Sequence, residues 1–143
     1  STITRLQNMG TPDYLISAAC QLVVAQRLAR KNCKNCKVPD DDVNPKVLQD
    51  LGFSAEQASR VKAIKGKGCE TCSNTGYKGR QGIYEILVVS KPLKEAILRK
   101  ATTPELRQIA VKEGFQTMQD MGKRLIASGD LNFREYERVL SNE

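Results

Sequence analysis

The chain of 143 residues contains no histidine and no tryptophan, and its aromatic residues are four tyrosines and three phenylalanines. The absence of histidine excludes both a histidine general base and a histidine metal ligand. The scarcity of aromatic rings argues against a protein that stacks nucleic-acid bases on them. No apolar run approaches the roughly 20 residues of a membrane-spanning helix, and the first residues lack the charged-then-apolar pattern of a secretory signal. We therefore expect an intracellular chain with no transmembrane segment.

Four of the five cysteines form two Cys-x-x-Cys pairs, and this pattern carries most of the information in the sequence. Zinc takes four thiolates at about 2.3 Å, and a gap of two residues lets one tight turn present both sulfurs to the same ion. Glycines surround the second pair and allow its backbone to fold back, while lysines flank the first pair and favour thiolates. The sequence predicts a closed structural Zn²⁺ site with four ligands: Cys33, Cys36, Cys69 and Cys72.

Two other interpretations of the cysteine pairs are a redox dithiol and a pair of disulfides. A redox Cys-x-x-Cys normally stands alone in a thioredoxin-like setting, and disulfides need an oxidising compartment. Neither interpretation explains two matched pairs. The fifth cysteine, Cys20, lies in an apolar run, and we expect it to be a small buried side chain rather than a ligand.

Capping residues and hydrophobic periodicity predict an α+β fold that is mainly helical. A strand is expected from about residue 22 to 30, with a longer helix as the alternative, and another strand over 82–89, on either side of a compact helical insert between the cysteine pairs. The four last helices are expected to form a small bundle. The predicted helix starts are Thr11-Pro12, Asn44-Pro45, Ser54 with Gln57, Ser90, Thr103-Pro104, Thr117 and Asn132 with Glu135.

The sequence around the second cysteine pair resembles a known family. Residues 66–85 read Gly-x-Gly-Cys-x-x-Cys-x-x-x-Gly-Tyr-Lys-Gly-Arg-x-Gly-Ile-Tyr-Glu, which is similar to the C-terminal region of the ATPases that power type IV pilus assembly and type II secretion. Upstream, Ile3-x-Arg-Leu-x-x-Met-Gly and Ala25-Gln-Arg-Leu-x-Arg-x-x-Cys resemble the segment that leads from the ATPase core to its tetracysteine element. Residues 106–114 and 118–129 resemble the terminal helices, so the resemblance covers essentially the whole chain.

The resemblance implies three regions: residues 1–32 as the end of a RecA-like ATPase core, 33–82 as a tetracysteine zinc-binding subdomain, and 83–143 as a strand with a C-terminal helical subdomain. The parent would be a hexameric motor that binds ATP and Mg²⁺ in the bacterial cytoplasm, peripheral to the inner membrane. Its implied partners are the remaining ATPase domains, neighbouring ring subunits, an inner-membrane platform protein and a regulatory protein. Pilus retraction motors generally lack the tetracysteine element, and Tyr84 beside Gly82-Ile83 favours pilus assembly, with type II secretion as the alternative.

The chain lacks the parts of this family that perform chemistry. It has no Gly-x-x-x-x-Gly-Lys-Ser/Thr phosphate loop, no acidic strand end to hold Mg²⁺ and no histidine for the family's His-box. We therefore interpret it as the C-terminal fragment of a longer protein and expect no ATP hydrolysis by the fragment. A structural, coupling or partner-docking role follows. An enzyme in its own right is disfavoured, because a closed four-cysteine site leaves no position for an activated water.

The formal charge of +7 raises two further hypotheses. Arg27, Lys78 and Arg80 are candidates for a subunit-interface or nucleotide contact, and the alternative for the last two is a solvated basic turn. A nucleic-acid-binding zinc module is a second functional class, because lysines gather near both cysteine pairs. The acidic run at residues 40–42 breaks this basic patch and argues against nucleic acid as a partner.

Overall fold

A computed structural model describes residues 5, 8–10 and 22–140. The helix predicted after Thr11 and the environment predicted for Cys20 lie outside the described residues. The chain divides into two compact units: unit 1 comprises Ser1–Ala25 and Glu85–Thr117, and unit 2 comprises Gln26–Tyr84 and Met118–Glu143. Among the described residues, no helix is long and apolar enough to cross a membrane.

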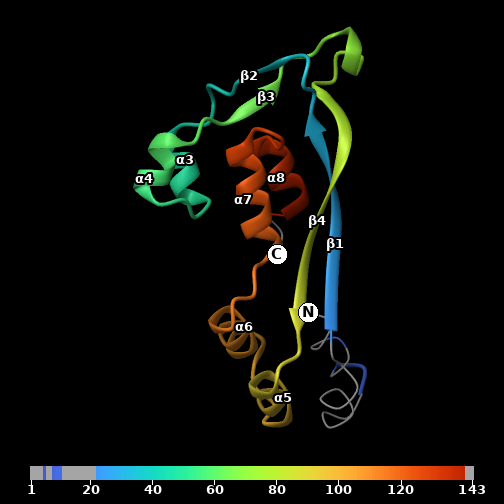
Figure 1. The fold of residues 1–143 in the computed structure, drawn as a ribbon, viewed down its shortest axis with the longest axis vertical. Coiled ribbons are helices and arrows are strands. Elements are labelled where there is room, and N and C mark those ends of the chain that lie inside the picture. The colour runs from blue at the N-terminus through green and yellow to red at the C-terminus, as the bar shows by residue number, and fades with distance from the viewer. Residues whose placement is uncertain (1–4, 6–7, 11–21, 141–143) are drawn as a thin grey trace. The chain divides into compact units, whose positions relative to one another are not determined.

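Two long strands, β1 (Leu22–Asn32) and β4 (Tyr77–Val88), pair with each other, and the border between the units falls inside both (Figure 1). Both predicted strands are confirmed. Strand β4 begins five positions earlier than the prediction, at a run of polar residues and glycines that have weak intrinsic strand preference. Pairing with β1 holds this run extended, which is a tertiary effect that local propensity does not contain.

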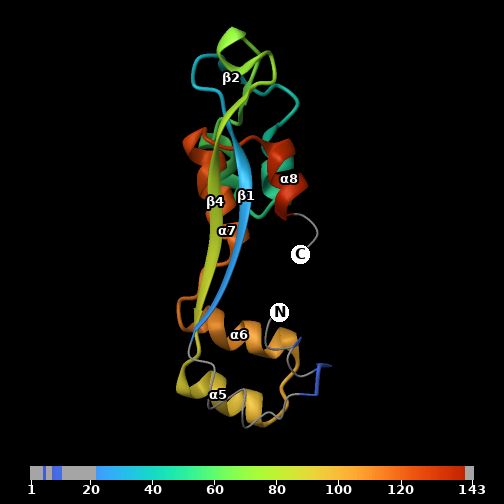
Figure 2. The same ribbon diagram turned by 90° about the vertical axis from the view of Figure 1, so that its right-hand side faces the viewer.

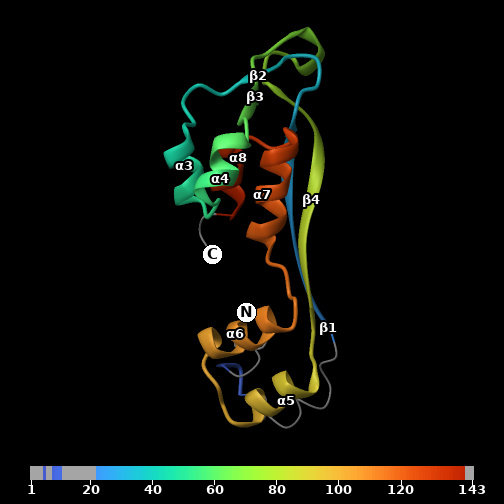
Figure 3. The same ribbon diagram turned by 60° about the vertical axis from the view of Figure 1, so that its left-hand side comes forward.

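The insert between the cysteine pairs belongs to unit 2. Strands β2 (Lys37–Pro39) and β3 (Ile64–Gly66) pair antiparallel, with Val38 opposite Lys65. Beyond them come two short helices, α3 (Pro45–Asp50) and α4 (Ala55–Arg60), as the sequence predicts (Figure 3). Ser54 and Gln57 form the predicted capping box, each side chain bonding to the other's backbone N–H. The insert buries one leucine and one alanine side chain from these helices.

The next two helices lie in unit 1 and enclose its hydrophobic core. Helix α5 (Lys91–Leu98) is capped by Ser90, and α6 (Thr103–Lys112) is capped by Thr102, and the two pack side by side (Figure 2). The core of unit 1 consists of apolar side chains from the end of β4 and the residue after it, from α5 and from α6. These side chains are packed away from water, and no ion pair is buried among them. The buried members of this core are Val89, Leu93, Ala96, Ile97 and Leu106.

The last two helices lie in unit 2. Helix α7 (Met118–Ser128) and helix α8 (Phe133–Leu140) pack closely against each other because Gly122 has no side chain. A Cβ at that position would lie 2.5 Å from Leu140 and 2.8 Å from the Tyr136 ring. The four C-terminal helices thus form two pairs, one in each unit, while a single bundle remains a prediction from the sequence.

Candidate metal centre

All four cysteines predicted as metal ligands come together at one end of the β2–β3 pair. Their sulfur atoms lie within 4.8 Å of one another. Sγ of Cys33 is 3.7 Å from Sγ of Cys69, and Sγ of Cys36 is 3.8 Å from Sγ of Cys72. Tetrahedral Zn–S bonds of about 2.3 Å place neighbouring sulfurs roughly 3.8 Å apart, so the cluster has the dimensions of a zinc–thiolate site. A disulfide of about 2.05 Å does not fit these separations.

Glycines let the backbone on either side of the second cysteine pair come close together. A Cβ on Gly66 would lie 2.0 Å from the carbonyl oxygen of Gly76, and a Cβ on Gly76 would lie 2.5 Å from the oxygen of Gly66. Gly76 also has a φ of 83°, in the left-handed region that glycine adopts at low cost. This close backbone contact places the second cysteine turn against β3, as the glycine spacing of the sequence indicates.

Backbone N–H groups point at the sulfurs. Gly76 donates to Sγ of Cys72 at 3.2 Å, Cys69 donates to the same sulfur at 3.3 Å, and Gly68 donates to Sγ of Cys36 at 3.3 Å. Such donors stabilise thiolates, and in metal sites they orient the ligands and tune their basicity. The chain therefore supplies both the four donors of a soft metal and the polar groups that surround them.

The pKa values of three of the cysteines depart from the ordinary value in different directions. Burial raises the pKa of the Cys36 thiol to about 11, whereas the Asn35 amide, which donates to Sγ of Cys69, lowers the pKa of Cys69 to about 6. Burial also raises the pKa of Cys72, but backbone donors outweigh it and lower that pKa. With a pKa of about 11, the Cys36 thiol on its own stays protonated at neutral pH. A divalent cation at the cluster would supply the charge that favours its deprotonation.

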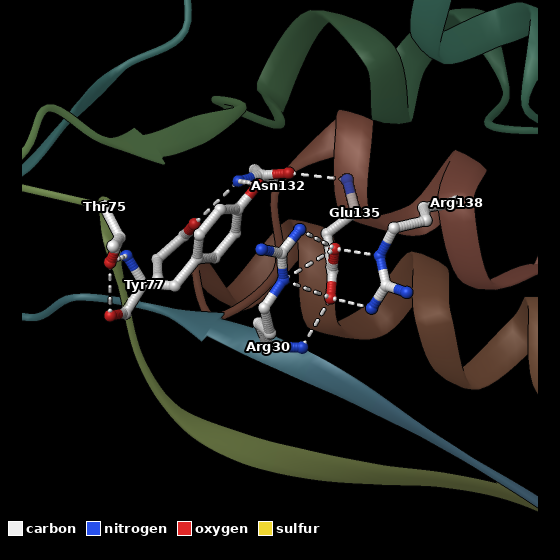
Figure 4. A network of polar contacts seen from close by, with 7 residues as sticks. Arg30, Thr75, Tyr77, Asn132, Glu135 and Arg138 are labelled. Atoms are coloured by element: carbon white, nitrogen blue, oxygen red, sulfur yellow. Dashed lines mark hydrogen bonds and ion pairs between the residues drawn. The ribbon is translucent and has the colours of Figure 1, made fainter.

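A buried carboxylate lies in unit 2 where α8 meets β1 (Figure 4). Glu135 of α8 is 0% exposed and accepts hydrogen bonds from the Arg30 backbone N–H at 2.6 Å and from the guanidinium groups of Arg30 and Arg138 at 2.9 and 2.7 Å. Burial alone raises its pKa, but these donors outweigh burial and lower the pKa to about 2. Arg30 also covers the Tyr77 ring, with 4.1 Å between the guanidinium carbon and the ring centroid.

Two buried asparagines, Asn32 and Asn132, form a second set of contacts between the strands and the C-terminal segment of unit 2. Asn32, which is 1% exposed and directly precedes Cys33, donates from its side chain to the carbonyls of Ile64 and Gly129. The Asn132 amide donates to Oδ1 of Asn32 at 3.2 Å and to the Tyr77 hydroxyl at 3.0 Å, as Figure 4 shows for the second contact. No buried side-chain nitrogen or oxygen in the described part of the chain lacks a partner.

Sequence reasoning missed Glu135, Arg30 and the Asn32–Asn132 pair as parts of this site. It predicted Asn132 as the cap of α8, and the Glu135 backbone N–H does donate to Oδ1 of Asn132 at 2.7 Å. It assigned the Glu135 side chain to that same cap, whereas the carboxylate bonds to Arg30 and Arg138. A carboxylate three residues after an N-cap gives no signal of a partner on a distant strand.

The three basic candidates lie at different places. Arg27 is half-buried and its guanidinium donates to the carbonyl of Val139 in α8. Lys78 is exposed, donates to the carbonyl of Thr71 at 3.1 Å, and lines a hollow of about 520 Å³ beside the cysteines. Lys31 and Lys34 line the same hollow. Arg80 is exposed in β4. The cysteines and Lys78 therefore come together, and Arg27 contacts α8 instead.

The fold and the site define an α+β protein with a cluster of four cysteines at one end of two short antiparallel strands. The chain matches the model of the family described as "Type II/IV secretion system protein" over residues 1–138, and it belongs to that family. The resemblance to pilus-assembly and secretion ATPases is thereby confirmed.

The curated relatives include both type IV pilus assembly ATPases and type II secretion system proteins. The type IV pilus assembly ATPase PilB of Thermus thermophilus is 41% identical over 84% of this chain, and PilB of Pseudomonas aeruginosa is 36% identical over 96%. The type II secretion system protein HxcR of Pseudomonas aeruginosa is 32% identical over 97%. The chain spans 13%, 24% and 25% of the lengths of these three relatives, so it corresponds to one region of each.

Proposed function

We propose that this chain is the structural zinc element and coupling region of an ATPase that powers type IV pilus assembly. The observation that carries the proposal is the four-sulfur cluster: its sulfur atoms all lie within 4.8 Å of one another, and three of their separations are 3.7–3.8 Å, as in a closed zinc–thiolate site. Cys33, Cys36, Cys69 and Cys72 would hold the ion, which supplies positive charge and a cross-link but no chemistry. The insert that it closes buries too little apolar surface to fold alone, so metal binding there contributes folding free energy.

The family supports the wider assignment. We propose that the parent is a hexameric cytoplasmic motor at the inner membrane, which binds ATP and Mg²⁺ outside this region and acts on a platform protein. Residues 1–32 would end its RecA-like core, 33–82 would form the zinc subdomain and 83–143 would form the strand and helical subdomain. The chain itself would hydrolyse no ATP, since it contains no phosphate loop. Arg27, Lys78 and Arg80 stay candidates for contacts with neighbouring subunits, nucleotide or a regulatory protein.

Native mass spectrometry of the purified chain tests the metal. We expect one zinc per chain in the wild type and none in Cys69→Ser. The matched control is Cys20→Ser, which removes the cysteine outside both pairs and should keep the full complement of zinc. Retention of zinc by Cys69→Ser, or a wild-type mass that corresponds to two disulfides without metal, would contradict the ligand assignment.

A pair of chimeras tests pilus assembly against secretion. Pseudomonas aeruginosa offers matched hosts, because its PilB and its HxcR are 36% and 32% identical to this chain. The matching region of each protein is replaced by this chain in a strain that lacks the native copy. We expect the PilB chimera to restore surface pili and the HxcR chimera to leave secretion defective. Restored secretion without pili would move the assignment to type II secretion. A chimera that carries Cys69→Ser is the control for whether the restored function depends on metal.

A further inference from the structure

The metal-binding turns are joined directly to the buried polar contacts described above. Asn32 is bonded through one peptide to Cys33, and Tyr77 is bonded through one peptide to Gly76, whose N–H donates to Sγ of Cys72. The Cys33 N–H in turn donates to the Gly76 carbonyl at 2.9 Å. Both cysteine turns therefore lead, without an intervening loop, into residues that contact the C-terminal helices.

Most of the polar contacts on the far side of this junction belong to the α7–α8 hairpin, and one joins the Asn32 side chain to the Ile64 carbonyl of β3. The backbone N–H groups of Arg30 and Asn32, two residues apart on β1, donate to the Glu135 carboxylate and to the Asp130 carbonyl at 2.6 and 2.8 Å. The hairpin thus occupies the edge of β1 that a further strand would otherwise pair with. Because Glu135 and Asn32 are buried, moving β1 away from the hairpin leaves polar groups of both unsatisfied at once.

We propose that the Asn32–Asn132–Tyr77 hydrogen bonds couple metal binding at the four cysteines to docking of the α7–α8 hairpin, so that one event stabilises the other. This inference rests on the proposed zinc site. An ion fixes Cys33 and Cys72 and with them the positions of Asn32 and Tyr77, which are the two groups that receive the Asn132 amide. By thermodynamic linkage, a docked hairpin must strengthen metal binding by the same factor by which the metal strengthens docking.

Asn132→Ser separates this coupling from simple helix capping. Serine is also a strong N-cap, so the bond to the Glu135 backbone N–H can be kept while both amide donors are lost. We expect Asn132→Ser to bind zinc about tenfold more weakly than the wild type in competition with a chromophoric chelator, in line with losses at outer-shell positions of metal sites. Tyr77→Phe, which removes one acceptor of the same amide, is the second variant and should weaken binding to a lesser extent.

Thr102→Ala is the matched control, because it removes a helix cap in unit 1 and should leave zinc affinity unchanged. Hydrogen exchange of the wild type with and without zinc gives the reciprocal readout. We expect metal removal to speed exchange in α7 and α8 and to leave α5 and α6 unchanged. Wild-type affinity in both Asn132→Ser and Tyr77→Phe, together with metal-independent exchange in α8, would overturn the coupling while leaving the zinc site intact. A wild type that binds no zinc would instead overturn the proposed function and this inference with it.

Discussion

The two units of this chain differ in what they bury besides apolar side chains. In the described part of unit 1, α5 and α6 pack around leucine, isoleucine, valine and alanine side chains, and no charged side chain is buried there. Unit 2 also has an apolar core, which includes Ile83, Ile126 and Leu140, but it buries Glu135, Asn32 and Asn132 as well and gathers four thiols, while the two helices of its insert bury one leucine and one alanine. A short segment that cannot build a large core can obtain a unique structure from a metal and from fully satisfied polar contacts.

The comparison also separates non-directional from directional stabilisation. Apolar burial in unit 1 depends on area and packing, so helices can shift slightly without losing it. Unit 2 adds to its apolar core hydrogen bonds and sulfur positions that tolerate little displacement, because a buried donor without a partner costs about 1–3 kcal/mol. On the proposed zinc site, we expect unit 2 to be the part of the molecule whose geometry responds to metal.

Leu93→Ala tests the apolar side of the comparison and carries the largest expected effect. Leu93 is fully buried in unit 1, and truncation of such a leucine costs about 2–5 kcal/mol through lost burial and the remaining cavity. Hydrogen exchange should show loss of protection in α5 and α6. Zinc stoichiometry by native mass spectrometry should stay at one per chain, and loss of zinc in this variant would contradict the independence of the two units.

Glu135→Gln tests the polar side. We expect the free energy of unfolding to fall by about 3 kcal/mol at neutral pH, because the variant removes a buried anion from two guanidinium groups. The pKa of the Glu135 carboxyl, about 2, lies well below the ordinary 4.5. The stabilisation from a lowered pKa is complete above pH 4.5 and is lost as the pH falls through about 2. Denaturant unfolding should thus give a constant difference between wild type and variant from pH 8 to 5. A difference that shrinks within this range would show that Glu135 titrates with a pKa far above 2.

The smallest expected effects come from a pair of matched helix caps. Ser54→Ala in unit 2 and Thr102→Ala in unit 1 each break a capping box and should each cost about 1 kcal/mol. Exchange rates in α4 and α6 measure the two losses separately. A clearly greater loss at Ser54 would mean that the insert depends on its local caps more than the core of unit 1 does.

Much of the fold followed from local signals in the sequence. The capping box at Ser54 and Gln57 and the caps at Asn44 and Ser90 predicted helix starts that the structure confirms, because a cap involves residues only three positions apart. The start of β4 at Tyr77 was missed, since its glycine-rich polar run becomes a strand only through pairing with β1. For the same reason the sequence could not show that α7 and α8 belong with the cysteine cluster.

By itself, the sequence determined the four sulfur donors, their paired spacing and the family, because spacing within a turn fixes which thiols face one ion. Only the tertiary structure decided what surrounds them. Asn32 meets Asn132 across 100 positions of chain, and Arg30 meets Glu135 across 105. No periodicity or capping rule links residues so far apart, since their contact exists only after the strands and helices have packed. The clustering of the four cysteines was therefore readable from the chain, and the contacts proposed to couple them to α7–α8 were not.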